Sequence, residues 1–428
     1  MRTLLLVIVC GAVVLAGCGG VPASPAGGSA TPGRESSAFP GSAGQAAQRS
    51  GVAAGSQAGS GRGCPAAPVI AGFPAGIQFV SASLGWAVSQ ETILATTDGG
   101  RNWTVQYSGH ITLTSVDFIS RQVGWAVGTS ALLATSDGGA RWTALPEPCP
   151  VIRSVHFVSP DAGFAVAGGS SDASAESGPE VPEVAGVVLM TSDGGRRWRV
   201  LPAPANAQTV CFSNPQIGWL GAGGRLYRST TGGRRWVQVV ATPVSAGYPT
   251  GLALTPLGAM MIVQCAGAGS AWALDVGELG TMEKQPYVGY HAGPAGAVPI
   301  FADQYFPQPG VPAPGPGPYA GPFSAISPSA AAFIGWCAPC GPGPGTAPWD
   351  LVTGSGASLT PEGNVGGLNE PEAASFVSPQ LGWVIGLVIS NSGTGVPLQR
   401  QRILVTDDAG RTWHDQYTGE PRRAWAAA

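Results

Sequence analysis

Charged side chains are scarce in this chain. Only 11% of the 428 residues are Asp, Glu, Lys or Arg, and Lys284 is the single lysine. The formal net charge is −3, and the arginines are scattered along the chain. Binding to nucleic acid needs a concentrated positive surface that neutralises phosphates. The composition therefore excludes a basic nucleic-acid-binding protein, and we expect no nucleic-acid partner.

Long uninterrupted helical patterns are also missing. The chain contains 66 Gly and 39 Pro, which interrupt helices and favour turns. Hydrophobic residues make up 44% of the sequence, which is enough to build a core. We therefore expect an all-β fold with many turns rather than a helical bundle.

The longest apolar run, Leu4 to Leu15, follows Arg2 and is too short to span a bilayer comfortably. Such a run at the N-terminus is typical of an export signal. It ends in Leu15-Ala16-Gly17-Cys18, which resembles the lipobox of bacterial lipoproteins. The resemblance implies a signal peptide at residues 1–17, lipidation of Cys18, and anchoring at the extracytoplasmic face of the cell membrane. An ordinary signal with a chance cysteine is the alternative.

Residues 18–63 form a low-complexity segment. Gly, Ala, Ser, Pro and Gln dominate it, and such a composition buries too little apolar surface to fold. We expect a disordered tether with a reach of about 35–40 Å. A folded region at 64–417 and a C-terminal tail at 418–428 complete the expected domain organisation.

A repeat organises the rest of the chain. A Gly-Trp or Gly-Phe pair recurs after a short apolar strand, and each pair is followed by an element such as Thr-Ser-Asp-Gly-Gly-Ala-Arg-Trp. The fourth copy has Thr231 where the others have an acid. The recurring acids are Asp98, Asp137, Asp193 and Asp408, and the recurring tryptophans are Trp103, Trp142, Trp198, Trp236 and Trp413.

Each of these elements predicts a β-hairpin. Asp and Gly tolerate the backbone angles of tight turns, and a carboxylate can accept hydrogen bonds from turn amides. The elements resemble the Asp-box, or BNR, repeat of β-propellers. The full pattern is similar to photosystem II stability and assembly factors, which implies structural roles for the recurring acids and tryptophans and help in assembling envelope protein complexes.

The resemblance implies a ring of blades. We expect seven blades, with six or eight as alternatives, because the repeat degenerates between Val237 and Glu372. Closing a ring leaves only short, protected sheet edges. The expected blades lie near residues 76–108, 112–146, 152–202, 207–242, 250–286, 322–361 and 372–417.

Blade topology divides the insertions from the Asp-boxes. Turns joining the first to the second strand and the third to the fourth lie on one face, which therefore carries the Asp-boxes. The other face receives the insertions at 168–186, 342–348 and 390–400 and a link between blades at 286–322. Long loops often carry function. We therefore predict that binding occurs on the face opposite the Asp-boxes.

The 286–322 segment mixes Pro and Gly with aromatic and polar residues. Such side chains suit a protein or glycan surface, although a lid packed on the ring is an equal alternative. The acidic insertion at 168–186 has the composition of a solvated loop. The candidate ligand-binding residues in the 286–322 segment are Tyr287, Tyr290, His291, Asp303, Tyr305, Phe306 and Tyr319.

Asp117, His156 and Cys211 occupy equivalent positions on successive innermost strands. They could form a catalytic cluster, but no oxyanion-hole motif accompanies them. We expect instead a hydrogen-bonded pair of Asp117 and His156 lining the axis. The four histidines lack metal-ligand spacing, so we expect neither a metal nor a cofactor.

The function expected is a non-catalytic binding or assembly module for envelope proteins. A sialidase needs an arginine cluster near the axis on the loop-bearing face, whereas the seven Asp-box arginines belong to the other face and Arg153 is the main arginine near an inner strand. A glycoside hydrolase needs two acids about 5–10 Å apart, and no motif pairs them. A glycan-binding or glycoside-hydrolysing propeller is the alternative function.

Six cysteines remain beyond the signal and the lipidation site. An even number outside the cell favours disulfides, although 15 connectivities are possible. The Cys337-Ala-Pro-Cys340 motif resembles a thioredoxin-type active site, but the Gly-Pro tract after it forbids the helix that such a site needs. We expect a local disulfide there, and consider two weaker pairs, Cys64 with Cys149 and Cys211 with Cys265.

Overall fold

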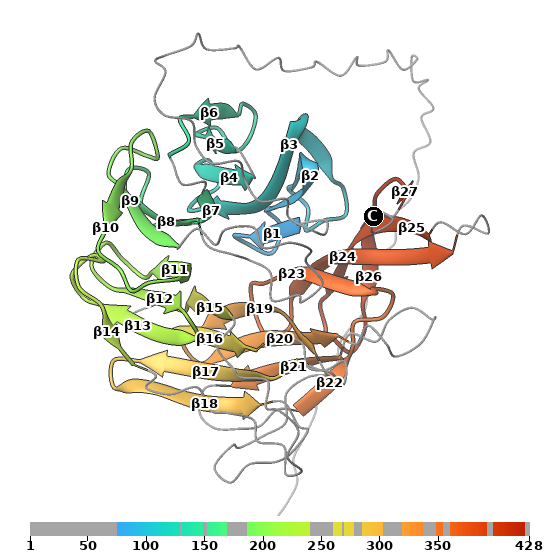
Figure 1. Cartoon of the computed structure of the whole chain (residues 1–428). Coiled ribbons are helices and arrows are strands. Elements are labelled where there is room, and N and C mark those ends of the chain that lie inside the picture. Colours follow the sequence, from blue (N-terminus) through green and yellow to red (C-terminus); the bar gives the residue numbers. More distant parts are fainter. Residues whose placement is uncertain are drawn as a thin grey trace, which may run out of the picture. The chain divides into compact units, whose positions relative to one another are not determined.

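The computed structural model describes residues 75–128, 131–148, 152–168, 186–239, 260–267, 269–277, 285–302, 319–336, 348–353, 360–391 and 397–423. Every regular element in these residues is a β-strand, and all the strand pairs are antiparallel (Figure 1). No helix of the described part is long and apolar enough to cross a membrane. The predicted all-β class is confirmed.

The first half of the described chain forms three sheets, each from a continuous segment. The first sheet contains β1 (Ala75–Phe79), β2 (Gly85–Thr96), β3 (Thr104–Phe118), β4 (Gly124–Gly128), β5 (Ala131–Thr135) and β6 (Thr143–Leu145). The second contains β7 (Ile152–Phe157), β8 (Gly163–Ala167), β9 (Val187–Thr191) and β10 (Arg199–Leu201). The third contains β11 (Ala207–Phe212), β12 (Gly218–Ala222), β13 (Arg225–Ser229) and β14 (Val237–Gln238).

The second half forms three more sheets. The fourth contains β15 (Met260–Cys265), β16 (Ala271–Val276), β17 (Tyr287–Gly293) and β18 (Gly296–Ala302). The fifth contains β19 (Tyr319–Ser327), β20 (Ala330–Trp336), β21 (Pro348–Thr353) and β22 (Thr360–Asn364). The sixth contains β23 (Glu370–Phe376), β24 (Gly382–Asn391), β25 (Pro397–Thr406), β26 (His414–Thr418) and β27 (Arg422–Arg423).

The first sheet holds two repeats, and β3 belongs to both. Its first half, up to Ser108, pairs with β2, whereas Leu113 to Phe118 pairs with β4. The strand thus ends one repeat and begins the next without a break. We call the first strand of each repeat its inner strand; the inner strands are β1, the second half of β3, β7, β11, β15, β19 and β23.

The sheets close on themselves. Each inner strand contacts the next one along the chain, and β23 contacts β1, as the neighbouring blue and orange strands in Figure 1 show. We call each contact between successive inner strands a seam. The polypeptide does not cross the closing seam within the described residues, so side chains and hydrogen bonds hold it.

Aromatic rings fill four of the seams. A ring from the second strand of one repeat stacks on a phenylalanine that ends the inner strand of the next repeat. Stacked rings add about 0.5–1.5 kcal/mol beyond their buried area. The stacked pairs are Trp86 with Phe118, Trp125 with Phe157, Phe164 with Phe212, and Trp383 with Phe79, with centroids 3.4–3.5 Å apart.

Two expected boundaries are wrong. The fourth sheet runs from Met260 to Ala302, whereas the prediction ended that blade at residue 286. The segment after Pro286 was read as a loop because of its Gly and Pro content. Those residues make the turn of a hairpin between β17 and β18 (Figure 1). The expected tail from 418 also contributes a strand, because β27 pairs with β25.

Candidate functional site

In each Asp-box turn, the Asp carboxylate accepts hydrogen bonds from other residues of the same turn. In the first, Asp98 Oδ1 accepts hydrogen bonds from Thr96 Oγ1 and from the Asn102 N–H, both at 2.9 Å. The Gly100 N–H donates to Thr96 Oγ1 at 2.8 Å. The same bonds recur at Asp137, Asp193 and Asp408.

These bonds favour the ionised form of each acid. The side-chain and backbone bonds from Asn102 lower the pKa of Asp98 to about 2, and the bonds from Thr412 lower the pKa of Asp408 to about 2. Backbone bonds also lower the pKa values of Asp137 and Asp193. In the fourth copy, Thr231 Oγ1 accepts from the Arg235 N–H at 2.9 Å, so a hydroxyl replaces the carboxylate.

The tryptophan of each Asp-box packs inward. Its ring meets, edge to face, the phenylalanine that ends the inner strand of the same repeat. The pairs are Trp103 with Phe79, Trp142 with Phe118, Trp198 with Phe157, Trp236 with Phe212, and Trp413 with Phe376, at 5.9–6.3 Å.

The Asp-box turns share one face with the turns between the first and second strands. The Gly99 N–H donates to Ser83 O at 2.8 Å, and the Gly138 N–H donates to Gln122 O at 2.8 Å. Equivalent bonds occur in the other three Asp-box repeats. We call this side the Asp-box face and the opposite side the loop face. The predicted insertions fall between β8 and β9, β20 and β21, and β24 and β25, whose facing ends lie on the loop face. In the last of them, residues 390–391 and 397–400 belong to the paired strands rather than to a loop.

A single position on each inner strand reaches across its seam. This residue directly precedes the terminal phenylalanine in five inner strands and pairs with the first aromatic residue of the second strand in six. We call the seven side chains the latch residues. They are Gln78, Asp117, His156, Cys211, Gln264, Ser324 and Ser375.

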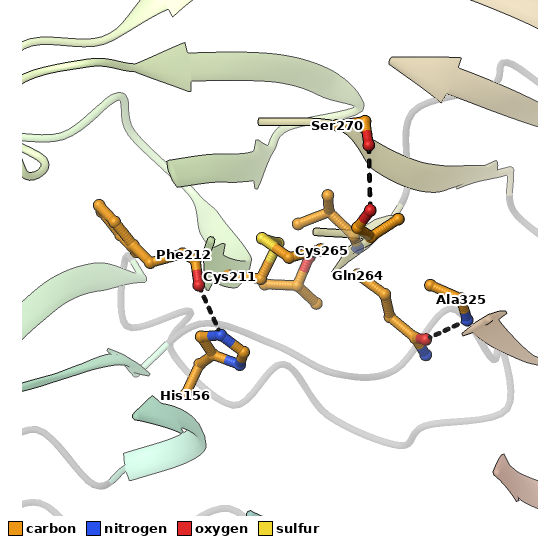
Figure 2. Close-up of a disulfide and its surroundings, with 10 residues drawn as sticks. His156, Cys211, Phe212, Gln264, Cys265, Ser270 and Ala325 are labelled. Carbon is orange, nitrogen blue, oxygen red and sulfur yellow. Dashed lines mark hydrogen bonds between the residues drawn. A yellow bond between two sulfur atoms is a disulfide. The ribbon is translucent and has the colours of Figure 1, made fainter. Parts of the chain in front are cut away.

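Six latch residues hydrogen-bond to the backbone of the next inner strand. Gln78 Oε1, Asp117 Oδ2, Ser324 Oγ and Ser375 Oγ accept from the N–H groups of Phe118 (2.6 Å), Phe157 (2.5 Å), Phe376 (2.9 Å) and Phe79 (2.9 Å). His156 Nε2 lies 2.8 Å from Phe212 O, and Gln264 bonds to Phe323 O (2.7 Å) and the Ala325 N–H (2.8 Å). The seventh latch residue, Cys211, forms a disulfide with Cys265 (Figure 2).

The expected hydrogen bond between Asp117 and His156 is therefore wrong. Both side chains bond to the backbone of the following repeat instead. A carbonyl oxygen only accepts, so His156 Nε2 carries the proton in its bond to Phe212 O (Figure 2). Burial raises the pKa of Asp117, while His156 and the Phe157 N–H oppose the rise.

Of the cysteine predictions, the pair of Cys211 and Cys265 is confirmed. Cys64, Cys149, Cys337 and Cys340 lie outside the described residues, as does Cys18. Within the described part, no group of three or more His, Cys, Asp or Glu side chains is placed to hold a metal ion.

The aromatic candidates divide into two groups. Tyr287 and Tyr290 are each 2% exposed and belong to the core around β17, so their assignment to a surface loop is wrong. His291, on the same strand, lies 4.6 Å from the Trp272 ring. Tyr319 begins β19. Asp303, Tyr305 and Phe306 lie outside the described residues.

A pocket that the sequence did not predict lies at the closing seam. It has a volume of about 130 Å³ and lies between β2 of the first sheet and β24 to β27 of the last. The hairpin of β24 and β25 extends past Leu387 toward the loop face and supplies one wall. We call it the seam pocket; its polar lining is Ser89, Thr92, Gln399, Gln401, Tyr417, Glu420 and Arg422.

Two glutamates, Glu370 and Glu372, lie on β23, and Glu372 contacts the lining of this pocket. Gln401 Nε2 donates to Glu372 Oε2 at 3.4 Å. Burial raises the pKa of Glu372 to about 8, and the neighbouring Glu370 adds to the rise. Burial also raises the pKa of Glu370. Glu372 is therefore largely protonated at neutral pH and can donate as well as accept a hydrogen bond.

Sequence reasoning singled out three latch residues and missed four. The four missed residues carry amide or hydroxyl groups, whereas Asp117 and His156 carry titratable groups, so residue type alone does not reveal that the positions are equivalent. The missed residues are Gln78, Gln264, Ser324 and Ser375. Their position before the end of each inner strand was the available signal. For the seam pocket there was no such signal, because strands from opposite ends of the chain form it.

These features define a β-propeller with Asp-box turns. The family model described as photosynthesis system II assembly factor YCF48 matches residues 69–151, which confirms the resemblance that the repeat indicated. No curated protein matches the chain.

Several solved structures are similar in fold. They include the calcium-binding protein regucalcin from Agrobacterium tumefaciens, with 15% identity, 61% of this chain and 81% of that chain covered, and a TM-score of 0.39. A GH74 xyloglucanase from Xanthomonas campestris has 12% identity, 78% and 62% coverage, and a TM-score of 0.34. A chain of the mitotic checkpoint complex has 8% identity, 79% and 95% coverage, and a TM-score of 0.47.

Proposed function

We propose that this protein is a lipid-anchored, extracytoplasmic β-propeller of seven blades that acts as a non-catalytic binding or assembly module for envelope proteins. One observation carries the proposal. The latch residues of the inner strands hold the seams, while the seam pocket and the strand ends that flank the insertions lie on the loop face.

Counting inner strands rather than sheets supports seven blades. The six-stranded first sheet holds two inner strands, β1 and the second half of β3. Each of the seven inner strands has one latch residue that reaches the next. This arrangement supports the count expected from the repeat.

The anchor rests on the N-terminal sequence. The apolar run that ends at Leu15-Ala16-Gly17-Cys18 supports cleavage before Cys18 and acylation of this cysteine. Two or more acyl chains would then hold the protein stably at a bilayer. The tether at 18–63 gives the propeller reach. The disulfide between Cys211 and Cys265 fits an oxidising compartment outside the cytoplasm.

A structural use of the acids and of His156 argues against catalysis. A general base or nucleophile needs a free atom directed at a substrate. Asp117 Oδ2 and His156 Nε2 each bond to the backbone of a neighbouring strand, and both carboxylate oxygens of Asp98 accept hydrogen bonds within its own turn. The ring therefore acts as a rigid support for its loop face.

The partner class comes from the family match. That family is described as an assembly factor of photosystem II, and its likeness to the repeats here supports an envelope protein complex as the partner. The photosynthetic role itself is not carried over, because a fold does not transmit a ligand.

Co-purification from native membranes tests this function. The double variant Ser89→Tyr/Glu420→Arg fills the seam pocket and reverses a charge at its rim. The matched control, Arg101→Glu/Arg411→Glu, reverses two exposed charges on the Asp-box face. We expect a protein that enriches with the parent chain and the control but is lost with the pocket variant. Equal enrichment with all three chains contradicts a binding role for this part of the loop face.

Glycan binding is a second candidate, and the seam pocket favours it. Amide, hydroxyl and tyrosyl groups beside Glu420 and Arg422 are the kind of lining that hydrogen-bonds sugar hydroxyls. This candidate is tested by measuring the binding of purified cell-envelope polysaccharide fragments to the parent chain and the pocket variant. Saturable binding that the variant loses, without release of shorter sugars, supports a glycan-binding module.

A further inference from the structure

The seam between β11 and β15 differs from the other six. Its latch residue, Cys211, makes a covalent bond to Cys265 in place of a side-chain hydrogen bond to the backbone. Figure 2 shows the disulfide between two hydrogen-bonded latches, His156 with Phe212 on one side and Gln264 with Ala325 on the other. The disulfide is thus the one covalent latch, and the other six latches are hydrogen bonds.

This seam also lacks the stacked rings of the preceding seam, where Phe164 stacks on Phe212. The position after the latch residue, which is Phe157 or Phe212 in the preceding repeats, is Cys265 in this one. Among the described residues, Trp219 therefore stacks on no phenylalanine, and the Arg228 guanidinium lies over its ring at 5.6 Å. Both cysteines stand where four other seams have a hydrogen-bonding side chain and a stacked phenylalanine.

Among the seams that the chain crosses, this one has the longest connection. Twenty-one residues connect Gln238, at the end of β14, to Met260, at the start of β15. Five residues connect Leu201 to Ala207 in the preceding link. A longer connection restricts the separation of its ends less. A cross-link is worth most where the chain itself restricts separation least.

Three hydrogen bonds remain at this seam besides the disulfide. The N–H groups of Met261 and Val263 donate to Gln208 Oε1 (2.9 Å) and Thr209 Oγ1 (3.0 Å), and Thr209 Oγ1 donates to Met261 O (2.8 Å). All three involve β11 and β15 directly. They report whether the two strands stay together.

We propose that the disulfide between Cys211 and Cys265 is a reducible clasp, and that its reduction by a dithiol opens the propeller at the seam between β11 and β15. Cys211 is 3% exposed and Cys265 is half-buried, so Cys265 is the accessible partner. The fitting reductant class is an extracytoplasmic dithiol of the Cys-X-X-Cys type.

The reaction balances as a two-electron exchange. One thiolate of the reductant attacks the Cys265 sulfur, the S–S bond breaks, and Cys211 leaves as a thiolate that takes up a proton. The second thiol of the reductant then displaces Cys265, which also takes up a proton. The reductant leaves as a disulfide, and both cysteines of this chain are thiols.

Hydrogen exchange on the full chain tests the clasp, with dithiothreitol as the reductant and oxidised glutathione as the reoxidant. The Met261 and Val263 amides report on the proposed opening, and the Phe79 amide, bonded to Ser375 Oγ, reports on the closing seam. We expect reduction to speed exchange at Met261 and Val263 at least tenfold, with no change at Phe79. Reoxidation restores the slow exchange.

Two variants separate this disulfide from the other cysteines. Cys337→Ser/Cys340→Ser keeps the clasp and is expected to respond to dithiothreitol like the parent chain. Cys211→Ser/Cys265→Ser is expected to exchange fast at Met261 and Val263 with or without reductant. If this second variant does not fold, the comparison of the parent chain before and after reduction still tests whether reduction opens the seam.

Three results would overturn the clasp. The first is unchanged exchange at Met261 and Val263 after thiol titration shows that Cys211 and Cys265 are reduced. The second is equal acceleration at Phe79, which means general unfolding. The third is failure of dithiothreitol to reduce the pair in the folded chain.

Discussion

Trp383 of the last sheet stacks on Phe79 of the first, with ring centroids 3.4 Å apart and planes within 4° of each other. The Trp383 Nε1–H also donates to Gly99 O in the first Asp-box at 3.1 Å. Trp125 makes the same two contacts, with Phe157 and with Gly194 O. The closing seam is therefore built like an internal one.

The closing seam should depend strongly on Trp383. We expect Trp383→Ala to lower the free energy of unfolding by about 3–5 kcal/mol, because the fully buried ring leaves a cavity and an unpaired backbone carbonyl. Val200→Ala, at a position 63% exposed on an outer strand, is the control and should change it by about 0.5 kcal/mol or less. Urea unfolding measures both. A loss below about 1 kcal/mol for Trp383→Ala would contradict the assigned role.

Asp117 should behave as a structural acceptor. Asp117→Asn keeps an oxygen that can accept from the Phe157 N–H and removes a buried charge, so we expect it to be neutral or stabilising. Asp117→Ala leaves that N–H unpaired and should cost about 1–3 kcal/mol. Thermal unfolding compares the two variants. Equal destabilisation by both would show that the carboxylate charge itself matters.

The last Asp-box contains a strained residue. Ala409 has φ of +61°, at the position where the first Asp-box has Gly99 with φ of +79°. Left-handed backbone costs a non-glycine residue about 1–2 kcal/mol, partly offset by the larger chain entropy of glycine in the unfolded state. We expect Ala409→Gly to stabilise the protein by about 0.5–1 kcal/mol.

The reciprocal change, Gly99→Ala, should destabilise by a similar amount or more, because its Cβ meets Ala82 O at 2.9 Å. Chemical denaturation of both variants checks the pair. The same sign of change in both would rule out the backbone explanation.

Glu372 should make the protein less stable as the pH rises. Its pKa is raised to about 8 in the folded chain from an ordinary value near 4.5. Its contribution to stability is thus fully present below about pH 4.5 and is lost as the pH rises toward 8. We expect Glu372→Gln to remove this dependence and to stabilise the protein at pH 8 by an amount on the order of a few kcal/mol.

Measuring the urea midpoint of both chains between pH 4.5 and 8.5 checks this prediction. Glu420→Gln is the control, since that exposed carboxyl lies at the rim of the same pocket. Parallel pH profiles for the parent chain and Glu372→Gln would show that Glu372 does not titrate in this range.

Much of the fold could be predicted from the sequence, because the Asp-box turn is a local structure. Its carboxylate, hydroxyl and glycines lie within five residues, so the pattern around Asp98 or Asp137 carries its own geometry. The rule that hairpin ends alternate between two faces then placed the Asp-boxes and the insertions on opposite sides.

The fourth and fifth sheets could not be bounded in this way, because they lack the Asp-box. Tyr287 and Tyr290 were read as surface aromatics since Gly and Pro surround them. In the structure they face the core, where Tyr290 packs against residues of β11 and β15. How deeply a strand is buried depends on the strands beside it. The neighbours of β17 are set by strand pairing, and no local sequence motif indicates that pairing.

The site was less accessible to prediction than the fold. The equivalence of Asp117, His156 and Cys211 was visible, but the sequence did not say whether they face one another or the next strand. The structure shows that they face the next strand. The seam pocket depends on Gln401 and Thr92, which are more than 300 residues apart in the chain.

The latch residues connect each inner strand to the next with five kinds of side chain, so the seams are not all held by the same chemistry. A carboxylate that accepts an amide proton cannot replace a histidine that donates to a carbonyl, and neither can pair with the half-cystine of another repeat. A latch residue moved to another seam would therefore not always meet the partner atom that it needs. The seven positions are not interchangeable, although the repeats that carry them have nearly the same local shape.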